Sequence, residues 1–141
     1  MADIPTEHSR DLCKVCCVEG NIYLVGGHHR VTEYNTITRT WRSLPWLQQG
    51  RDGHSVCTLD NKIFVLSGSG SATSCEILDL SDNNLQWSYI SRMNRRHDGE
   101  AVIERKIYVL GGYHVTTVEV YDVDQGTLIN TVEAKGLFYF V

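Results

Sequence analysis

Three short apolar runs that end in glycine recur along this chain at a nearly constant step. The runs occupy residues 21–27, 62–68 and 106–112, and the third position of each is aromatic: Tyr23, Phe64 and Tyr108. The aromatic residues are 41 and 44 residues apart (23 to 64 to 108). A period of this length indicates a repeat architecture, in which each unit buries its apolar faces against its neighbours.

Other residues keep the same phase as these runs. An arginine precedes each aromatic by thirteen residues: Arg10, Arg51 and Arg95. A turn-like pair precedes each run, at 19–20, 60–61 and 104–105, although the third pair is a poor turn former. Three further positions repeat downstream of each run. The first is acidic in two units and threonine in the other: Glu76, Glu119 and Thr32. The second is Asn or Asp (Asn35, Asp79, Asp122), and the third is Trp41, Trp87 and, in the third unit, Leu128.

Each unit is predicted to form four strands. In the second unit we expect them at 55–59, 62–67, 75–78 and 86–90, because these runs are rich in β-branched and aromatic residues and are separated by polar or glycine-containing turns. A four-stranded antiparallel sheet repeated at this period is typical of a propeller blade. The predicted fold is therefore all-β: a partial β-propeller of about three four-stranded antiparallel blades.

The predicted blades occupy residues 10–50, 51–94 and 95–130. Residues 1–9 are a lead-in, and 131–141 are an atypical apolar tail, either an abrupt stop of the array or a strand that pairs with the third blade. The glycines permit positive φ and close backbone approach at the strand ends: Gly26, Gly27, Gly68, Gly111 and Gly112. The large aromatic side chains are expected to fill the space between sheets: Tyr23, Phe64, Tyr108, Trp41 and Trp87.

Composition narrows the classes of function. A net charge of -4 over 141 residues, with no run of Lys and Arg, gives no electrostatic footprint for nucleic acid. The apolar runs are too short to cross a bilayer, and the first residues lack the features of a secretory signal. Five cysteines, an odd number, and no Asn-x-Ser/Thr site favour a reducing, cytoplasmic setting with mostly buried thiols.

The repeated Gly-Gly, Tyr, Trp and loop Arg resemble the kelch motif, and most closely the blades of kelch-like proteins. The resemblance covers residues 10–130. It implies a propeller, usually of six blades, whose loops at one rim bind a short segment of a partner protein. In the kelch-like group the propeller commonly captures substrates for a cullin-RING ubiquitin ligase, while separate BTB and BACK domains dimerise and contact the ligase. Residues 1–9 are too few for a BTB domain, so we expect no cullin contact from this chain alone.

The resemblance places a partner-binding surface on the loops at one rim. The predicted contacts are the three arginines and the loops that follow the glycines: Arg10, His28, His29, Arg30, Arg51, Ser69, Ser71, Thr73, Arg95, Tyr113 and His114. Arginines that converge on a channel favour an acidic peptide, because the guanidinium pairs with carboxylates through two hydrogen bonds. The alternative is that the repeated arginines are structural and bond to carbonyls of adjacent loops.

No residue pattern indicates catalysis, and we expect neither an enzyme nor a metal or other cofactor. His28 and His29 are adjacent on a short loop and cannot easily chelate one ion. Cys13 and Cys16 form C-x-x-C without the helical context of a redox motif or a second pair for zinc. Residues 68–71 lack the lysine and helix of a phosphate-binding loop.

The expected function is therefore a protein-binding module, with substrate recognition for a ubiquitin ligase as the leading role. The alternatives are a cytoskeletal (actin) or scaffold-binding protein, or a partial product without function. An open arc of three blades exposes apolar faces and strand edges, which favours self-association. A longer protein, a dimer that completes six blades and a marginal fragment all fit; the fragment is preferred.

Overall fold

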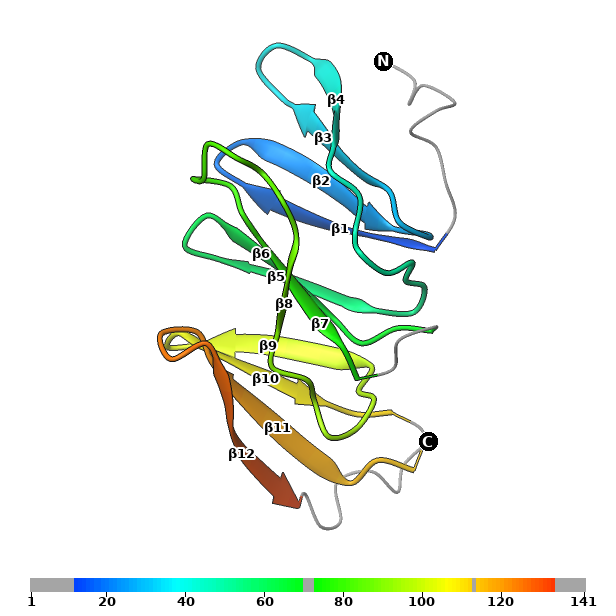
Figure 1. Cartoon of the computed structure of the whole chain (residues 1–141), viewed down its shortest axis with the longest axis vertical. Coiled ribbons are helices and arrows are strands. Elements are labelled where there is room, and N and C mark those ends of the chain that lie inside the picture. Colours follow the sequence, from blue (N-terminus) through cyan, green and yellow to red (C-terminus); the bar gives the residue numbers. More distant parts are fainter. Residues whose placement is uncertain (1–11, 70–72, 113, 134–141) are drawn as a thin grey trace.

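The computed structural model describes residues 12–69, 73–112 and 114–133. Within these ranges the chain forms twelve β-strands and no helix, so none of the described segments is a helix that could cross a membrane. The strands form three separate four-stranded antiparallel sheets, each connected in chain order. Figure 1 shows the sheets stacked one above another. The prediction of an all-β fold with three four-stranded blades is confirmed.

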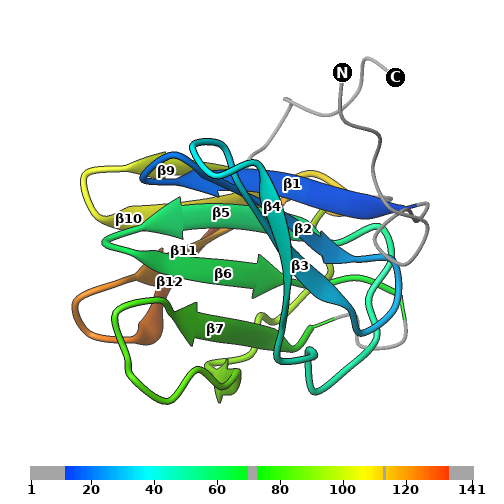
Figure 2. The ribbon, with the colours of Figure 1, turned by 90° about the horizontal axis from the view of Figure 1, so that it is seen from above.

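Blade 1 contains β1 (Cys13–Val18), β2 (Asn21–Gly26), β3 (Val31–Asn35) and β4 (Thr40–Leu44). Blade 2 contains β5 (Ser55–Leu59), β6 (Lys62–Leu66), β7 (Cys75–Asp79) and β8 (Ser88–Ile90). Blade 3 contains β9 (Gly99–Ile103), β10 (Lys106–Leu110), β11 (Thr117–Asp122) and β12 (Thr127–Glu133). The first strands of the blades, β1, β5 and β9, contact one another in sequence (Figures 1 and 2).

The predicted strands of blade 2 agree with the observed ones to within two residues at each end. The start of the predicted apolar tail, 131–141, belongs to a strand of blade 3. β12 extends through Glu133 and pairs with β11, with Thr117 opposite Glu133. Residues 131–133 therefore follow the expectation of a strand paired with the third blade. The rest of the tail, and the lead-in 1–9, lie outside the described residues, and the blade boundaries stay predictions.

The first two strands of every blade are joined by a two-residue turn in which both residues have positive φ. In blade 3 these residues are Glu104 (φ 47°) and Arg105 (φ 66°), neither of which favours that conformation. Arg105 forms ion pairs with Asp60 and Asp124 from neighbouring turns. The pairing of β9 with β10 thus imposes this turn in blade 3. In the other two blades the turn contains Gly20 or Asn61, which adopt positive φ more easily.

The repeated Asn or Asp residues close the third turn of each blade. Asn35 Oδ1 accepts hydrogen bonds from the backbone N–H groups of residues 37 and 38, at 2.9 Å each. Asp79 accepts from the N–H of residue 81 at 3.0 Å, and Asp122 from that of residue 125 at 2.9 Å. These side chains mimic a backbone turn, which explains why a short acceptor recurs at this phase.

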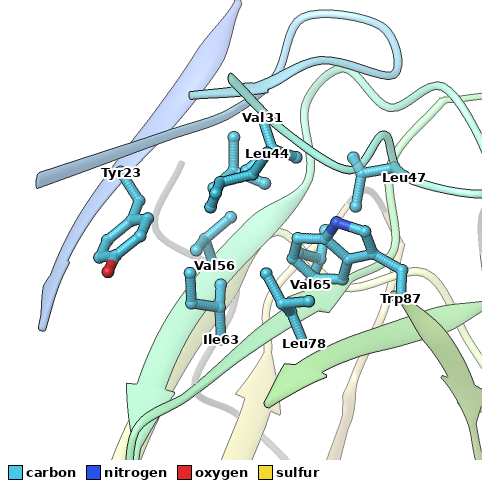
Figure 3. Packing of buried hydrophobic residues seen from close by; sticks show 10 residues of the cluster. Tyr23, Val31, Leu44, Leu47, Val56, Ile63, Val65, Leu78 and Trp87 are labelled. Atoms are coloured by element: carbon cyan, nitrogen blue, oxygen red, sulfur yellow. The ribbon is translucent and has the colours of Figure 1, made fainter. Parts of the chain in front are cut away.

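Alternate residues of each strand point to opposite sheet faces. We call the face toward the preceding blade the leading face and the face toward the next blade the trailing face. The trailing face of blade 1 packs on the leading face of blade 2 (Figure 3). This core contains Tyr23, Val25, Val31, Leu44, Leu47, Val56, Ile63, Val65, Leu78 and Trp87. Trp87 is 4% exposed and donates from Nε1 to the Pro45 carbonyl at 2.9 Å, so it fills the inter-blade space as predicted.

The trailing face of blade 2 packs on the leading face of blade 3. The second core contains Cys57, Phe64, Leu66, Cys75, Met93, Ile107, Val109 and Tyr121. Phe64 and Tyr121 meet edge to face, with ring centroids 6.0 Å apart. Because blade 2 is covered on both faces, every residue of β6 from Ile63 to Leu66 is almost completely buried. This explains why that strand has no alternation of polar and apolar residues.

Two of the predicted aromatic fillers lie on faces that no described blade covers. Trp41 is partly exposed and packs on Tyr34, with ring centroids 4.8 Å apart, on the leading face of blade 1. Tyr108 is partly exposed on the trailing face of blade 3. The sequence placed these side chains at the correct phase, but only a neighbouring blade would bury them fully.

All five cysteines lie within the described residues and none forms a disulfide. Burial raises the thiol pKa of Cys16 and of Cys57 to about 12 and that of Cys75 to about 11. The prediction of mostly buried thiols holds for Cys57 and Cys75, whereas Cys13 and Cys16 are only partly buried and Cys17 is exposed.

Candidate partner-binding rim

The loops predicted to bind a partner lie at one end of all three blades, which we call the linker rim. It consists of the β2–β3, β6–β7 and β10–β11 loops together with the linkers 45–54 and 91–98 between blades. This end is at the right of Figure 1. The two-residue turns, including 60–61 and 104–105, lie at the opposite end. The strand connectivity thus gathers the described members of the predicted site on one side of the molecule.

Each linker is bonded to the preceding rim loop by its backbone. The N–H of Leu47 donates to the His29 carbonyl at 2.8 Å, and the N–H of Met93 donates to the Thr73 carbonyl at 2.9 Å. Arg51 and His28 form an isolated antiparallel bridge in the first linker. Glycine is required where this linker crosses β2, because a Cβ at Gly26 (φ 85°) would lie 2.2 Å from His54 Cε1.

Arg51 lies inside the protein rather than on the rim surface. It is 1% exposed, and its guanidinium donates to Glu76 Oε2 from Nε at 3.0 Å and from Nη2 at 2.9 Å. Its remaining donors reach the Ser67 carbonyl (2.6 Å), the Ser74 carbonyl (2.8 Å) and Ser74 Oγ (2.7 Å). The alternative considered from the sequence, a structural arginine bonded to loop carbonyls, describes these contacts. A bound peptide would find this guanidinium buried and already occupied.

Glu76 binds the linker as well as the arginine. The N–H of Gln48 donates to Oε1 at 2.6 Å, and the N–H of Gln49 to Oε2 at 3.4 Å. The carboxylate is fully buried on the leading face of blade 2. One acidic side chain therefore satisfies the backbone of the incoming linker and the charge of Arg51 together.

Blade 3 repeats this arrangement with a histidine in place of the arginine. Glu119 accepts from the N–H groups of Asn94 (2.6 Å) and Arg95 (2.9 Å), and from His97 Nε2 at 2.7 Å. His97, which is 1% exposed, thus occupies the place of Arg51, while the Arg95 side chain is exposed. The connection from this residue to the first strand is two residues shorter in blade 3 (97 to 99, against 51 to 55). That shortening put Arg95, rather than His97, in register with Arg51 in the sequence.

The other predicted contacts divide into three groups. His28, Arg30, Ser69, Arg95 and His114 are exposed on the linker rim, and His29 and Thr73 are partly buried there. Arg10, Ser71 and Tyr113 lie outside the described residues. Contact of any of these residues with a partner stays a prediction.

The exposed rim residues that were not identified from the sequence include Trp46, Arg92 and Arg96. Trp46 is 64% exposed, stacks on His29 at a centroid distance of 6.0 Å, and with Arg30 lines a shallow hollow of about 210 Å³. Arg92 donates to Thr73 Oγ1 at 3.2 Å. A signal existed in the sequence, since Trp46 stands outside the repeat phase and two further arginines flank Arg95.

A second, larger hollow of about 380 Å³ opens between blades 1 and 2 at the opposite end. It is lined by Glu33, which accepts from the Tyr23 hydroxyl at 3.0 Å and from Arg42 Nη2 at 3.1 Å. Burial, together with the Glu33 carboxylate, raises the pKa of Tyr23 to about 12. The acid, phenol and guanidinium satisfy one another, and within the described residues no group of three His, Cys, Asp or Glu could hold a metal ion.

His54, buried beneath the rim, makes stability depend on pH. Its Nε2 contacts the Val25 carbonyl at 2.9 Å, so this nitrogen carries the proton, and Nδ1 has no hydrogen-bond partner. Burial, with a contribution from the Arg51 charge, lowers the pKa of His54 below its usual 6.5. Because the unfolded chain then binds the proton more tightly, stability is retained above pH 6.5 and is lost as the pH falls from there through the folded-state pKa.

We therefore expect His54→Gln, which keeps a donor for Val25, to flatten the decline in unfolding free energy between pH 7 and pH 5. The difference between the two slopes should approach at most about 1.4 kcal/mol per pH unit, the limit for one proton. Urea titrations of both proteins at several pH values measure this difference, because the contributions of groups common to both proteins cancel. Parallel pH profiles would contradict the assignment.

Comparison with known proteins agrees with the geometry. The kelch motif matches residues 9–46 and 50–94. Kelch-like protein 24 of Homo sapiens is 34% identical over 117 residues, covering 72% of this chain and 19% of that protein. Kelch-like protein 36 of Bos taurus is 30% identical over 127 residues, covering 74% and 21%. A putative F-box/kelch-repeat protein of Arabidopsis thaliana is 28% identical over 118 residues, covering 74% and 31%.

The chain thus spans about a fifth to a third of the length of these relatives. The motif match covers more than half of the chain, and the structure adds a third four-stranded blade beyond the matched residues. From both observations, the chain belongs to the kelch-repeat family of protein-interaction modules.

Proposed function

We propose that the linker rim binds an acidic segment of a partner protein, and that the chain thereby selects substrates for a cullin-RING ubiquitin ligase in the cytoplasm. The observation that carries the binding role is a group of exposed cations on the rim: Arg30, Arg92, Arg95 and Arg96. Arg51 does not belong to this group, because its side chain is buried. The exposed cations differ in position from blade to blade, as expected of recognition loops.

The chemistry of the rim suits carboxylates. A guanidinium offers paired N–H donors that match the two oxygens of Asp or Glu, and arginine and tryptophan are frequent anchors at protein interfaces. Trp46 lies next to the hollow lined by Arg30, so an acidic residue beside an apolar one fits this part of the rim. Arg96 is 46% exposed and only loosely paired, 3.8 Å from Asp98.

The ligase role rests on the likeness to kelch-like proteins, and recognition is the part of it that we assign to the described blades. The cytoskeletal alternative has no specific observation in its favour on this surface.

The binding proposal is tested with the double variant Arg95→Gln/Arg96→Gln, because both side chains are exposed and their loss leaves the buried Glu119 contacts in place. Peptides selected from a random library by the wild-type chain should be enriched in Asp and Glu. Their affinity should fall about tenfold in the double variant, with a weaker salt dependence. Fluorescence anisotropy measures both effects.

The matched control is Arg39→Gln, which removes an exposed arginine from the β3–β4 turn at the opposite end. It should bind the selected peptides as the wild type does. Selected peptides without acidic residues, or equal losses of affinity in the double variant and the control, would refute the proposal that the linker rim binds acidic segments. The ligase role has a separate test: proteins that contain the selected segment should accumulate in cells when cullin neddylation is blocked. Unchanged abundance would reject that role and leave the binding result intact.

A further inference from the structure

Three polar side chains lie side by side on the trailing face of blade 1. Register places Tyr23 of β2 opposite Glu33 of β3, and Glu33 opposite Arg42 of β4. Figure 3 shows the Tyr23 hydroxyl pointing away from the apolar cluster. The other two blades have aliphatic residues at the position of Glu33, namely Ile77 and Val120. The trailing face of a blade thus forms without a carboxylate at this position, so packing alone does not explain the acid in blade 1.

The Glu33 carboxylate is bonded through one of its two oxygens. The contacts with Tyr23 and Arg42 balance the charge of Glu33, but both reach Oε2. Oε1 accepts no hydrogen bond from the described residues, and it is not fully buried. By contrast, both oxygens of Glu76 and of Glu119 accept hydrogen bonds. Oε1 of Glu33 is therefore an acceptor that a bound group can reach.

Glu33 lines the hollow of about 380 Å³ between blades 1 and 2, which we call the blade-junction hollow. Its other side comes from blade 2, where the segment between β7 and β8 contributes the partly buried side chains of Leu80 and Leu85. Among the described lining residues, the charged groups are the carboxylates of Glu19 and Glu33 and the guanidinium of Arg42. The volume is within the range of about 300–1,000 Å³ for ligand pockets. The hollow thus combines an apolar wall with a net negative charge.

We propose that the blade-junction hollow binds the side chain of a lysine or arginine presented by a partner protein. The cationic head would donate a hydrogen bond to Glu33 Oε1, because an oxygen without a donor and a surplus of carboxylates favour a charged N–H group. The methylene stem would lie along Leu80 and Leu85, since long basic side chains combine a polar head with an apolar stem. The hollow lies at the end opposite the linker rim and selects the opposite charge, so this proposal is independent of the binding proposed there.

Arg42 limits the affinity of the hollow for a cation. Its side chain is 60% exposed and reaches Glu33 Oε2 at 3.1 Å. A guanidinium beside the carboxylate repels a second cation that approaches the same group. Removing this charge should therefore strengthen the binding of a basic side chain. The same change would weaken the binding of an anionic or zwitterionic ligand, for which Arg42 would be the attracting group, so one variant separates these classes of ligand.

The test is a titration of the isotope-labelled 141-residue chain with Nα-acetyl-arginine methylamide, followed by nuclear magnetic resonance. Asn21 and Asn61 line the hollow, so their side-chain amide signals report binding there. We expect these signals to shift with a Kd of about 1 mM, as for a small ligand held by few contacts, and the affinity to fall as salt is added. The citrulline counterpart has the same stem without the charge and should bind about tenfold more weakly.

Two variants test the roles of the charged groups. Glu33→Gln should lower the affinity for the arginine probe about tenfold or more, because the carboxamide keeps an acceptor for Tyr23 but carries no charge. Arg42→Gln should raise the affinity about threefold, and since it changes an exposed side chain, its result stands even if Glu33→Gln lowers the melting temperature. The matched control is Glu104→Gln, which removes an exposed carboxylate from the β9–β10 turn at the same end, outside the hollow. It should bind the probe as the wild type does.

Equal affinities for the arginine and citrulline probes, or weaker binding of the arginine probe by Arg42→Gln, would overturn the proposal. Absence of binding at about 10 mM probe, or shifts confined to signals outside the hollow, would do the same. Free arginine separates a protein side chain from a small molecule: binding more than about tenfold tighter than that of the blocked probe would overturn the assignment to a partner protein. The variant Arg95→Gln/Arg96→Gln should bind the probe as the wild type does, so this site and the linker rim can fail separately.

Discussion

Replacing Glu76 by alanine should destabilise the chain by about 3–5 kcal/mol, the range found when one partner of a buried ion pair is removed. The loss leaves the Arg51 guanidinium buried at 1% exposure without its carboxylate. It also leaves the N–H groups of Gln48 and Gln49 without their acceptor, so the linker between blades 1 and 2 loses its attachment. Chemical denaturation followed by tryptophan fluorescence measures the change, because Trp87 lies in the core of this contact.

The double variant Arg51→Met/Glu76→Leu is the control for this prediction. It removes both charges together, so it should be less destabilised than Glu76→Ala despite two substitutions. Glu119→Ala should lower the free energy of unfolding less than Glu76→Ala does. An imidazole that loses its carboxylate partner, as His97 would, can be neutral, whereas the Arg51 guanidinium cannot. A loss below about 1 kcal/mol for Glu76→Ala would show that water or a rearranged loop replaces the carboxylate.

The blade architecture could be predicted because its determinants are local and repeat. The Asn or Asp of the third turn acts within a few residues of its own strand, and the aromatic residue and the glycines mark the second strand and its end even though their contacts reach the next blade. Asp79, for example, bonds to the backbone two residues away. Three copies in one phase therefore fixed the number of strands and their order before any contact between blades was known.

The role of the repeated arginine could be predicted only as one of two alternatives, ligand contact or structural support. Whether a guanidinium faces a channel or the sheet interior depends on a carboxylate 25 residues later, and Glu76 was visible only as one of several marks. In blade 3 the repeat spacing pointed to the wrong residue. The connection to the first strand is two residues shorter there, so His97 takes the position of Arg51 and the Arg95 side chain is exposed on the rim. The binding surface on the loops is harder still, since exposure of Trp46 and Arg96 follows from how the linkers lie across the rim.

Phe64→Ala should destabilise the chain by about 3–5 kcal/mol, as large-to-small changes of fully buried aromatics do. Phe64 is 0% exposed between blades 2 and 3 and packs edge to face on Tyr121. Tyr23→Ala, at the same position in blade 1, should come close to this value, because Tyr23 is 2% exposed and also loses its bond to Glu33. Thermal and urea melts at low micromolar concentration measure both.

Tyr108→Ala is the matched comparison, because the same aromatic position is only partly buried in blade 3. In the single chain its cost should be less than half that of Phe64→Ala, since a side chain that stays partly in water loses less on truncation. Equal costs for Tyr108→Ala and Phe64→Ala would mean that Tyr108 is as well buried as the aromatic side chains between the described blades, and would contradict its partial exposure.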